Sequence, residues 1–179
     1  MALSNEVDAS HVPRADRPTV HRRGRWARAW RERGLLLRVL VLLAAARLAL
    51  LVVPFRRLAR YLGPADVESP LEVNSEVLAE AARVAWAIRV VSRRTPWAST
   101  CFPQALTGLV LLRGRGIATT LYLGAAIRRD RVGMEAHAWL RCGPCFVTGG
   151  AGHHEYGVVA RFGAPLNRGG HVRSLDSRP

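Results

Sequence analysis

One cysteine of this chain stands where a helix is expected to begin. Cys101 follows Ser99 and Thr100, two residues whose side chains can cap a helix, and Pro103 is well tolerated in a first helical turn. At a helix N-terminus, free backbone N–H groups and the positive end of the helix dipole favour a thiolate over a thiol. Cys101 is therefore a candidate nucleophile, although the position also suits a small apolar residue in a packed first turn.

A histidine in a short β-rich segment is the second candidate. In 136-AHAWL-140, alternation places His137 and Trp139 on one face of a strand and their neighbours on the other. A neutral imidazole within hydrogen-bond reach of a thiol can take its proton and later protonate a leaving amine. A cysteine on a helix and a histidine on a strand form the layout of papain-like nucleophilic catalysis, in which Trp139 would shield the pair from water.

The elements that would position these residues follow from the apolar pattern. Residues 76–93 place apolar side chains at steps of three and four, which predicts a helix, and a second helix runs from Cys101 until Gly114 and Gly116 end it. Four short β-rich segments separated by turn residues come next, at 117–127, 136–142, 145–149 and 156–162. This order predicts an α+β fold in which the Cys-bearing helix packs on an antiparallel sheet.

The region before residue 76 divides into a polar part and an apolar part. Residues 1–24 are polar, mixed in charge and dotted with Pro, which predicts a disordered, Arg-rich arm. The run 35-LLLRVLVLLAAARLALLVVPF-55 has the length of a membrane span, but Arg38 and Arg47 interrupt it and would be costly at depth in lipid. We therefore expect a helix packed on the soluble domain, with attachment at a membrane interface as the alternative. The predicted units are the arm at 1–24, a helical N-terminal extension at 25–75 and a catalytic core at 76–179.

Composition bounds the class of protein. The 179 residues suffice for one domain with a core, and they include 27 basic residues, all of them Arg, against 13 acidic ones. The 13 Arg within residues 1–60 fit a solvated arm, with an anionic membrane surface, a nucleic acid or an acidic peptide as the functional alternative. Because the chain lacks interleaved aromatics or a recognised nucleic-acid motif, we expect no nucleic-acid partner. Three cysteines and no apolar signal segment in residues 1–20 favour a reducing, cytoplasmic location.

Several separated motifs surround the two candidates in a fixed order. They are Pro96-Trp97, Ser99-Thr100-Cys101, Pro103-Gln104-Ala105-Leu106, Leu111-Leu112, Arg115-Gly116, Leu121, Leu123-Gly124 and Ala136-His137-Ala138-Trp139. In these residues the chain resembles the transglutaminase-like leader peptidases of lasso-peptide biosynthesis, the stand-alone form of the maturation B protein. The resemblance covers residues 76–150 at motif level and, more loosely, 54-PFRRLARYLG-63. It implies a transglutaminase-like cysteine protease that removes the leader of a ribosomally made precursor peptide, so that a separate cyclase can close the macrolactam.

The resemblance also implies a role for each candidate residue. Cys101 matches the nucleophile and His137 the general base, and we expect neither a cofactor nor a metal. The family pattern has an acidic residue about a dozen positions after the His, where this chain reads 147-VTGGAGHHE-155. Because a glycine has no side chain that could orient an imidazole, Glu155 is the candidate third member, and a Cys–His dyad is the alternative.

Partners follow from the same resemblance. The stand-alone enzymes receive the leader from a small separate recognition protein, and these 179 residues show no winged-helix-like module for that task. We therefore expect three partners, namely the precursor peptide as substrate, a separate leader-recognition protein, and the macrolactam-forming cyclase.

The tetrapeptide 142-CGPC-145 supports two alternative functions. Cys-Gly-Pro-Cys is the dithiol motif of thioredoxins, whose chemistry needs the first Cys at a helix start, where its pKa falls. Here a strand-like and then Gly-rich stretch follows, which favours a turn between two strands and weakens the alternative of a thiol-disulfide oxidoreductase. A zinc-binding module would draw on Cys142, Cys145, His153 and His154, although adjacent histidines on a strand point to opposite faces.

Overall fold

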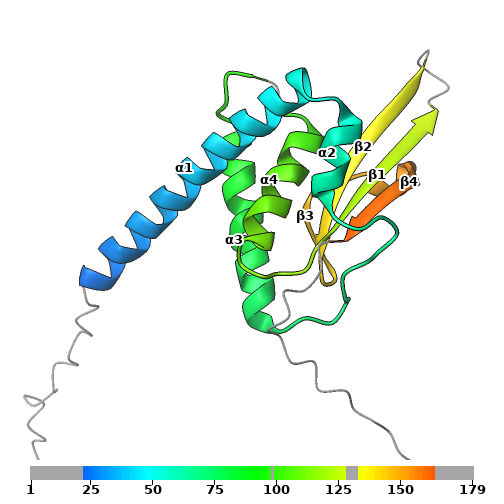
Figure 1. Cartoon of the computed structure of the whole chain (residues 1–179). Coiled ribbons are helices and arrows are strands. Elements are labelled where there is room, and N and C mark those ends of the chain that lie inside the picture. Colours follow the sequence, from blue (N-terminus) through cyan, green and yellow to red (C-terminus); the bar gives the residue numbers. More distant parts are fainter. Residues whose placement is uncertain (1–21, 98, 128–132, 164–179) are drawn as a thin grey trace, which may run out of the picture.

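The computed structural model describes residues 22–97, 99–127 and 133–163, with the backbone alone for 22–31. Within these ranges, helices come first and strands afterwards (Figure 1). The elements are α1 (Arg22–Val52), α2 (Phe55–Leu62), α3 (Ser75–Ser92), α4 (Cys101–Arg113), β1 (Thr120–Ile127), β2 (Met134–Cys142), β3 (Cys145–Thr148), the 3₁₀ turn η1 (His153–Glu155) and β4 (Gly157–Gly163). The predicted α+β fold is confirmed.

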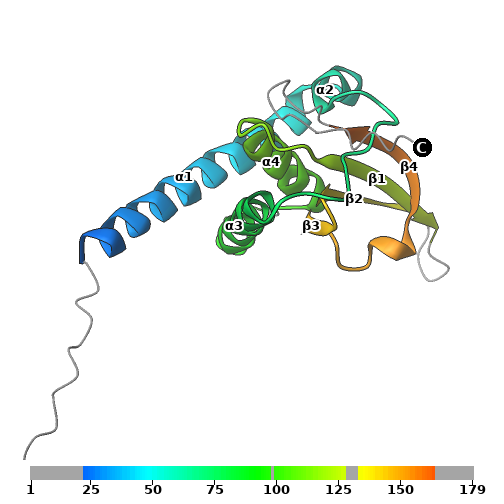
Figure 2. The same ribbon diagram turned by 90° about the horizontal axis from the view of Figure 1, so that it is seen from below.

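The four strands form one antiparallel sheet in the order β3-β2-β1-β4. The chain leaves β3 at one edge of the sheet and pairs as β4 at the other edge, beyond β1. Residues 149–156 therefore cross a face of the sheet, and we call them the crossover segment. Figure 2 shows the helices on one side of the sheet and this segment on the other.

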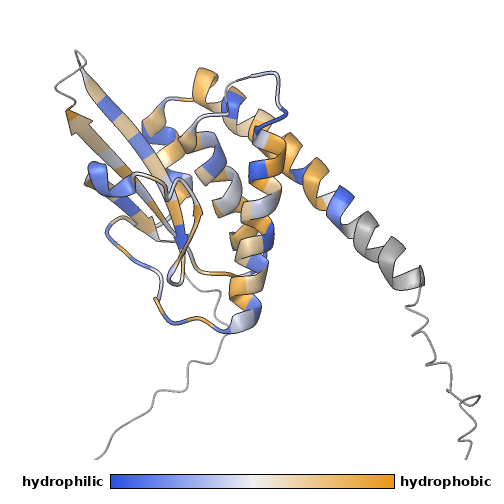
Figure 3. Cartoon of the chain, turned by 180° about the vertical axis from the view of Figure 1, so that it is seen from behind, coloured by the Kyte–Doolittle hydropathy of each residue, from blue (hydrophilic) through white to orange (hydrophobic). Residues whose placement is uncertain are grey.

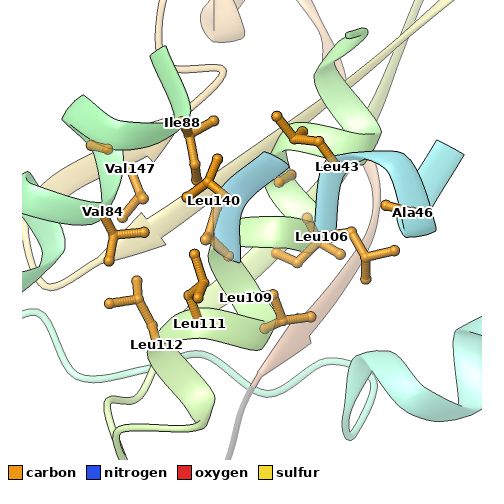
Figure 4. Close-up of a cluster of buried hydrophobic side chains, with 14 of the residues drawn as sticks. Leu43, Ala46, Val84, Ile88, Leu106, Leu109, Leu111, Leu112, Leu140 and Val147 are labelled. Atoms are coloured by element: carbon orange, nitrogen blue, oxygen red, sulfur yellow. The ribbon is translucent and has the colours of Figure 1, made fainter. Parts of the chain in front are cut away.

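A single apolar cluster joins the helices to the opposite face of the sheet. α1 contributes every third or fourth residue to it, namely Leu35, Val39, Leu43 and Ala46. α3 contributes the predicted stripe, with Ala81, Val84, Ile88 and Val91 buried. These side chains meet α4 and the strand residues Leu140 and Val147 (Figure 4). The expected packing of the apolar N-terminal segment as a helix on the domain is thus confirmed for one face of α1.

The long polar start of the chain is only partly covered by the described residues. Residues 1–21 of the predicted arm lie outside them, whereas residues 22–24 already belong to α1. The apolar cluster includes residues from both the predicted extension, 25–75, and the predicted core, 76–179. The placement of a boundary near residue 75 stays a prediction.

α4 lies close on β2 because a glycine faces the strand. A Cβ on Gly108 would come within 2.7 Å of the Leu140 side chain, so a larger residue would push the helix outward. Both elements run in the same direction, from the end of the molecule that holds the β1–β2 connection toward the opposite end (Figure 1). The start of α4 and the first half of β2 therefore lie at the same end of the domain.

Candidate active site

α4 begins at Cys101, as the sequence predicts. Thr100 is the N-cap residue by position, but its side chain makes no capping hydrogen bond. The first amides of a helix have no partner within the helix, and Pro103 carries no N–H at all. Among the described residues, the backbone N–H groups of Cys101 and Phe102 have no acceptor, and we expect them to face an incoming oxygen atom.

Side chains tie down the turn that leads into α4. The Thr95 hydroxyl lies 2.8 Å from Ser99 Oγ and donates to the Trp97 carbonyl at 3.1 Å. From inside the helix, Gln104 Nε2 donates to the Ser99 carbonyl at 2.6 Å. The expected capping role of Ser99 is thus replaced by a bond within the turn. Gln104, which the sequence marks only as part of a motif, helps to fix the position of Cys101.

His137 is oriented by a backbone carbonyl. Its Nε2 lies 2.8 Å from the oxygen of Gly149, which is 12 residues further along the chain. Because a carbonyl oxygen only accepts, Nε2 must carry the hydrogen, and in the neutral ring Nδ1 is then the nitrogen with a free lone pair. This is the tautomer that a general base requires at Nδ1. The expectation that a glycine at this position could not orient the imidazole was wrong, because the main chain does so.

The conformation of Gly149 explains how its carbonyl reaches the ring. Its φ is +68°, in the left-handed region that favours glycine. A Cβ at Gly149 would collide with the Ala138 carbonyl oxygen and would lie 2.9 Å from the Trp139 Cα. The crossover segment therefore leaves β3 in close contact with the backbone of β2, beside His137.

Aromatic rings enclose the imidazole. The Tyr156 ring stacks on it at a centroid distance of 4.8 Å, and the Trp139 ring at 5.8 Å. Trp139 is 3% exposed, so its contact with His137 agrees with the predicted shielding role. Gly124, opposite His137 on β1, leaves room for both residues, because a Cβ there would lie 2.7 Å from the Trp139 ring and 2.9 Å from the Tyr156 Cβ. Sequence reasoning placed Tyr156 only at the start of a strand and so missed this contact.

Cys101 and His137 lie at the same end of the domain without being hydrogen-bonded to each other. Cys101 precedes Gly108 by seven residues, close to two helical turns, and so lies on the α4 face that packs against the sheet. His137 and Trp139 share the face covered by the crossover segment, whereas Leu140 faces α4. Among the described residues, no hydrogen bond joins Cys101 Sγ to the His137 ring. β2 therefore presents His137 on the face turned away from α4, and a direct contact between the His137 ring and Cys101 stays a prediction.

Comparison with known protein families finds a match to the transglutaminase-like superfamily over residues 49–161, which is more than half of the chain. The chain belongs to this superfamily. The matched region contains both Cys101 and His137, and its members are commonly cysteine peptidases or transferases related to papain. No curated protein matches the chain, and no solved structure matches it.

In this transglutaminase-like chain, Glu155 occupies an exposed position in η1, directly before Tyr156. The hydrogen bond of His137 Nε2 goes to the Gly149 carbonyl, so the ring orientation does not depend on a carboxylate at Nε2. The assignment of Glu155 as a third catalytic residue stays a prediction.

Glu155→Gln separates the triad from the dyad. We expect a change of less than about twofold in kcat, because the substitution removes a charge at an exposed site and leaves the Gly149 contact intact. If Glu155 instead held the imidazole in its tautomer, kcat would fall by up to about 10⁴-fold while precursor binding was kept. Steady-state rates and a binding titration on the same variant distinguish the two outcomes.

The CGPC tetrapeptide is a hairpin turn. Cys142 and Cys145 pair across β2 and β3, with Gly143 and Pro144 between them, and the strand β3 begins at Cys145 itself. Burial, together with the nearby Cys145 thiol, raises the pKa of Cys142, whereas dithiol redox catalysis needs a lowered pKa. No group of three His, Cys, Asp or Glu side chains in the described part of the chain could hold a metal ion. The geometry favours neither the redox nor the zinc alternative.

A double substitution at this turn, Cys142→Ala with Cys145→Ser, is expected to keep the cleavage rate within about twofold. Loss of the buried Cys142 thiol should lower the free energy of unfolding by about 1 kcal/mol, because the site is fully enclosed. Rates and a thermal melt measure both effects. A folded double variant without activity would restore the redox or zinc alternatives.

Proposed function

We propose that this transglutaminase-like protein is a cysteine peptidase that removes the leader from a lasso-peptide precursor before a separate cyclase closes the macrolactam. Cys101 is the nucleophile and His137 the general base. The observation that carries the proposal is the bond from His137 Nε2 to the Gly149 carbonyl, because it leaves Nδ1 as the basic nitrogen. Membership of the superfamily and the start of α4 at Cys101 add support.

The chemistry follows from the groups available. His137 Nδ1 takes the thiol proton of Cys101, and the thiolate attacks the scissile carbonyl. The N–H groups of Cys101 and Phe102 stabilise the resulting oxyanion, each contributing on the order of 3 kcal/mol. The imidazolium then protonates the leaving amine, and a water molecule activated by the same imidazole hydrolyses the thioester. The Gly149 carbonyl holds the ring throughout, as an acidic side chain would.

The choice of substrate rests on the motif resemblance in residues 76–150. A precursor peptide with a leader is the substrate, a separate recognition protein presents it, and the cyclase consumes the product in the cytoplasm. The neighbouring genes would supply these three sequences and thereby the reagents for the test.

The test is cleavage of the synthetic precursor by the purified chain, with and without the recognition protein, followed by mass spectrometry. We expect slow cleavage by the chain alone and fast cleavage, at one bond between leader and core, when the partner is added. Robust leader-dependent cleavage by the isolated chain would contradict the need for the partner. An intact precursor in both reactions, with a folded enzyme, would contradict the peptidase function itself.

A further inference from the structure

α1 carries a second apolar stripe that the core does not use. While Leu35, Val39, Leu43 and Ala46 face inward, an outer set of large apolar side chains is 58–75% exposed. The set consists of Leu37, Val41, Leu48, Leu51 and Val52, and we call it the outer stripe. In Figure 3, the part of α1 that carries hydropathy colour is mostly hydrophobic. Nothing in the proposed peptidase chemistry requires this surface.

Two arginines border the outer stripe, one on each side. At about 100° per residue, its five side chains fall within an arc of about 100°. Arg38 lies about 40° beyond Val52 on one side of the arc, and Arg47 about 40° beyond Leu51 on the other. The two charges that interrupt the apolar run therefore lie at the margins between the inner and outer faces. This is the arrangement of a helix that lies in a membrane interface, where long Arg side chains extend to the headgroups.

The surroundings of the outer stripe are also apolar and cationic. Beside its first half, Leu36, Leu37 and Leu40 form a groove of about 600 Å³ with Val90 and Val91 of α3, and Arg94 lines the rim. Beyond its second half, α2 opens with the exposed Phe55 and carries Arg56, Arg57 and Arg60. From residue 38 to residue 65 the sequence contains five Arg and no Asp or Glu. Exposed hydrophobic side chains and positive charge therefore occur together in this region.

Exposed apolar side chains beside positive charge suit a helix that lies on an anionic lipid surface better than a helix that crosses the bilayer. The segment Glu32–Val52 is long and apolar enough to cross a bilayer, and only 22% of its most apolar window is buried in the protein, so the contacts of its inner face, rather than the extent of burial, oppose a span. Its inner stripe belongs to the same cluster as α3 and α4, and Glu32 bonds Arg83 of α3 at 3.1 Å. A spanning α1 would have to leave this core and carry two Arg through lipid. Lying on the surface, α1 keeps the core and still buries the outer stripe.

We propose that α1 docks this protein on an anionic lipid bilayer through the outer stripe, with Arg38 and Arg47 contacting lipid phosphates. The docked surface ends next to the candidate active site. Phe55, which follows the outer stripe, contacts the ring of Phe102 at a centroid distance of 6.0 Å, and Phe102 follows Cys101. The end of α1 and the start of α4 are therefore connected through these two rings. The inference does not depend on the peptidase function.

Vesicle flotation of the full chain tests the proposal. We expect the chain to float with vesicles of equal parts phosphatidylglycerol and phosphatidylcholine. With vesicles of pure phosphatidylcholine, we expect it not to float. Binding should weaken with added salt, because screening reduces the attraction between Arg and phosphate. Alkaline carbonate should release the chain, since it is peripheral. Arg38→Gln with Arg47→Gln should weaken binding by about 25-fold, roughly fivefold for each charge.

A matched pair of substitutions controls for exposure. Leu51 on the outer stripe and Val159 on β4 are both 68% exposed. Leu51→Glu should weaken vesicle binding by about tenfold or more, because it removes a Leu that docking would bury in the bilayer and adds a charge that anionic lipids repel. Val159→Glu adds the same charge elsewhere and should change binding by less than about threefold. Equal melting temperatures show that both variants are folded.

Four results would overturn the proposal. They are equal binding to neutral and anionic vesicles, retention after carbonate extraction, which would indicate a span, and equal effects of Leu51→Glu and Val159→Glu. The fourth is self-association that Leu51→Glu abolishes, without any vesicle binding, because the outer stripe would then be covered by a second copy of this chain.

Discussion

Cys101→Ala is expected to abolish precursor cleavage and to leave the protein folded. The substitution removes the sulfur that forms the thioester, while the first turn of α4, with Pro103 and its bond from Gln104 to Ser99, stays in place. Loss of a catalytic nucleophile typically lowers kcat by a factor on the order of 10⁶. Single-turnover assays with enzyme in excess, read by mass spectrometry, measure the residual rate.

The matched control is Cys145→Ala, which removes another thiol, one that is exposed at the β2–β3 turn. This variant should cleave at the wild-type rate. A cysteine-directed peptide electrophile should label the wild type and Cys145→Ala at Cys101, and should fail to label Cys101→Ala at the active site. Full cleavage by a folded Cys101→Ala protein would show that the peptidase proposal is wrong.

The position of Cys101 was predictable because its signals are local. Capping residues before the helix, Pro103 within its first turn and Gly114 with Gly116 at its end all act within a few residues of the chain. The strands were predictable for the same reason, since alternation fixes which side chains share a face. His137 and Trp139 do share one, and their rings are in contact.

The hydrogen-bond partner of His137 could not be predicted, because it is a main-chain oxygen that only the folded chain brings close to the ring. A pattern search for the third catalytic residue looks for side chains, and Gly149 has none. The spacing was nevertheless informative, since Gly149, in the stretch where the resemblance led us to expect an acid, does contact the imidazole. Its positive φ and its close approach to the Ala138 carbonyl arise only once β3 and the crossover segment are folded.

For α1, the apolar pattern predicted a helix but not which of its faces packs against the domain. Because the run is apolar all round, the sequence alone could not say which stripe packs inward. In the structure, Leu35, Val39 and Leu43 pack inward, and Arg38 and Arg47 therefore lie at the margins of the remaining face. The same two residues that argued against a span in the sequence therefore become the main support for docking at a membrane surface.

His137→Gln is expected to have the second largest effect on cleavage. The Gln amide can still donate a hydrogen bond to the Gly149 carbonyl, so the site keeps its contact, but it cannot accept a proton from the Cys101 thiol. General base catalysis by a positioned imidazole contributes about 10²- to 10⁴-fold to the rate. The variant also lacks the imidazolium that protonates the leaving amine, which lowers the rate further. We expect kcat to fall by at least about 10³-fold with little change in KM, as measured by initial rates over a range of precursor concentrations.

Binding and melting measurements distinguish loss of the base from loss of structure. His137→Gln should bind the precursor and melt as the wild type does, since the Gln amide can keep the contact with the Gly149 carbonyl. A kcat within about threefold of the wild type in this folded variant would contradict the assignment of His137 as the base, because a positioned general base contributes about 10²- to 10⁴-fold.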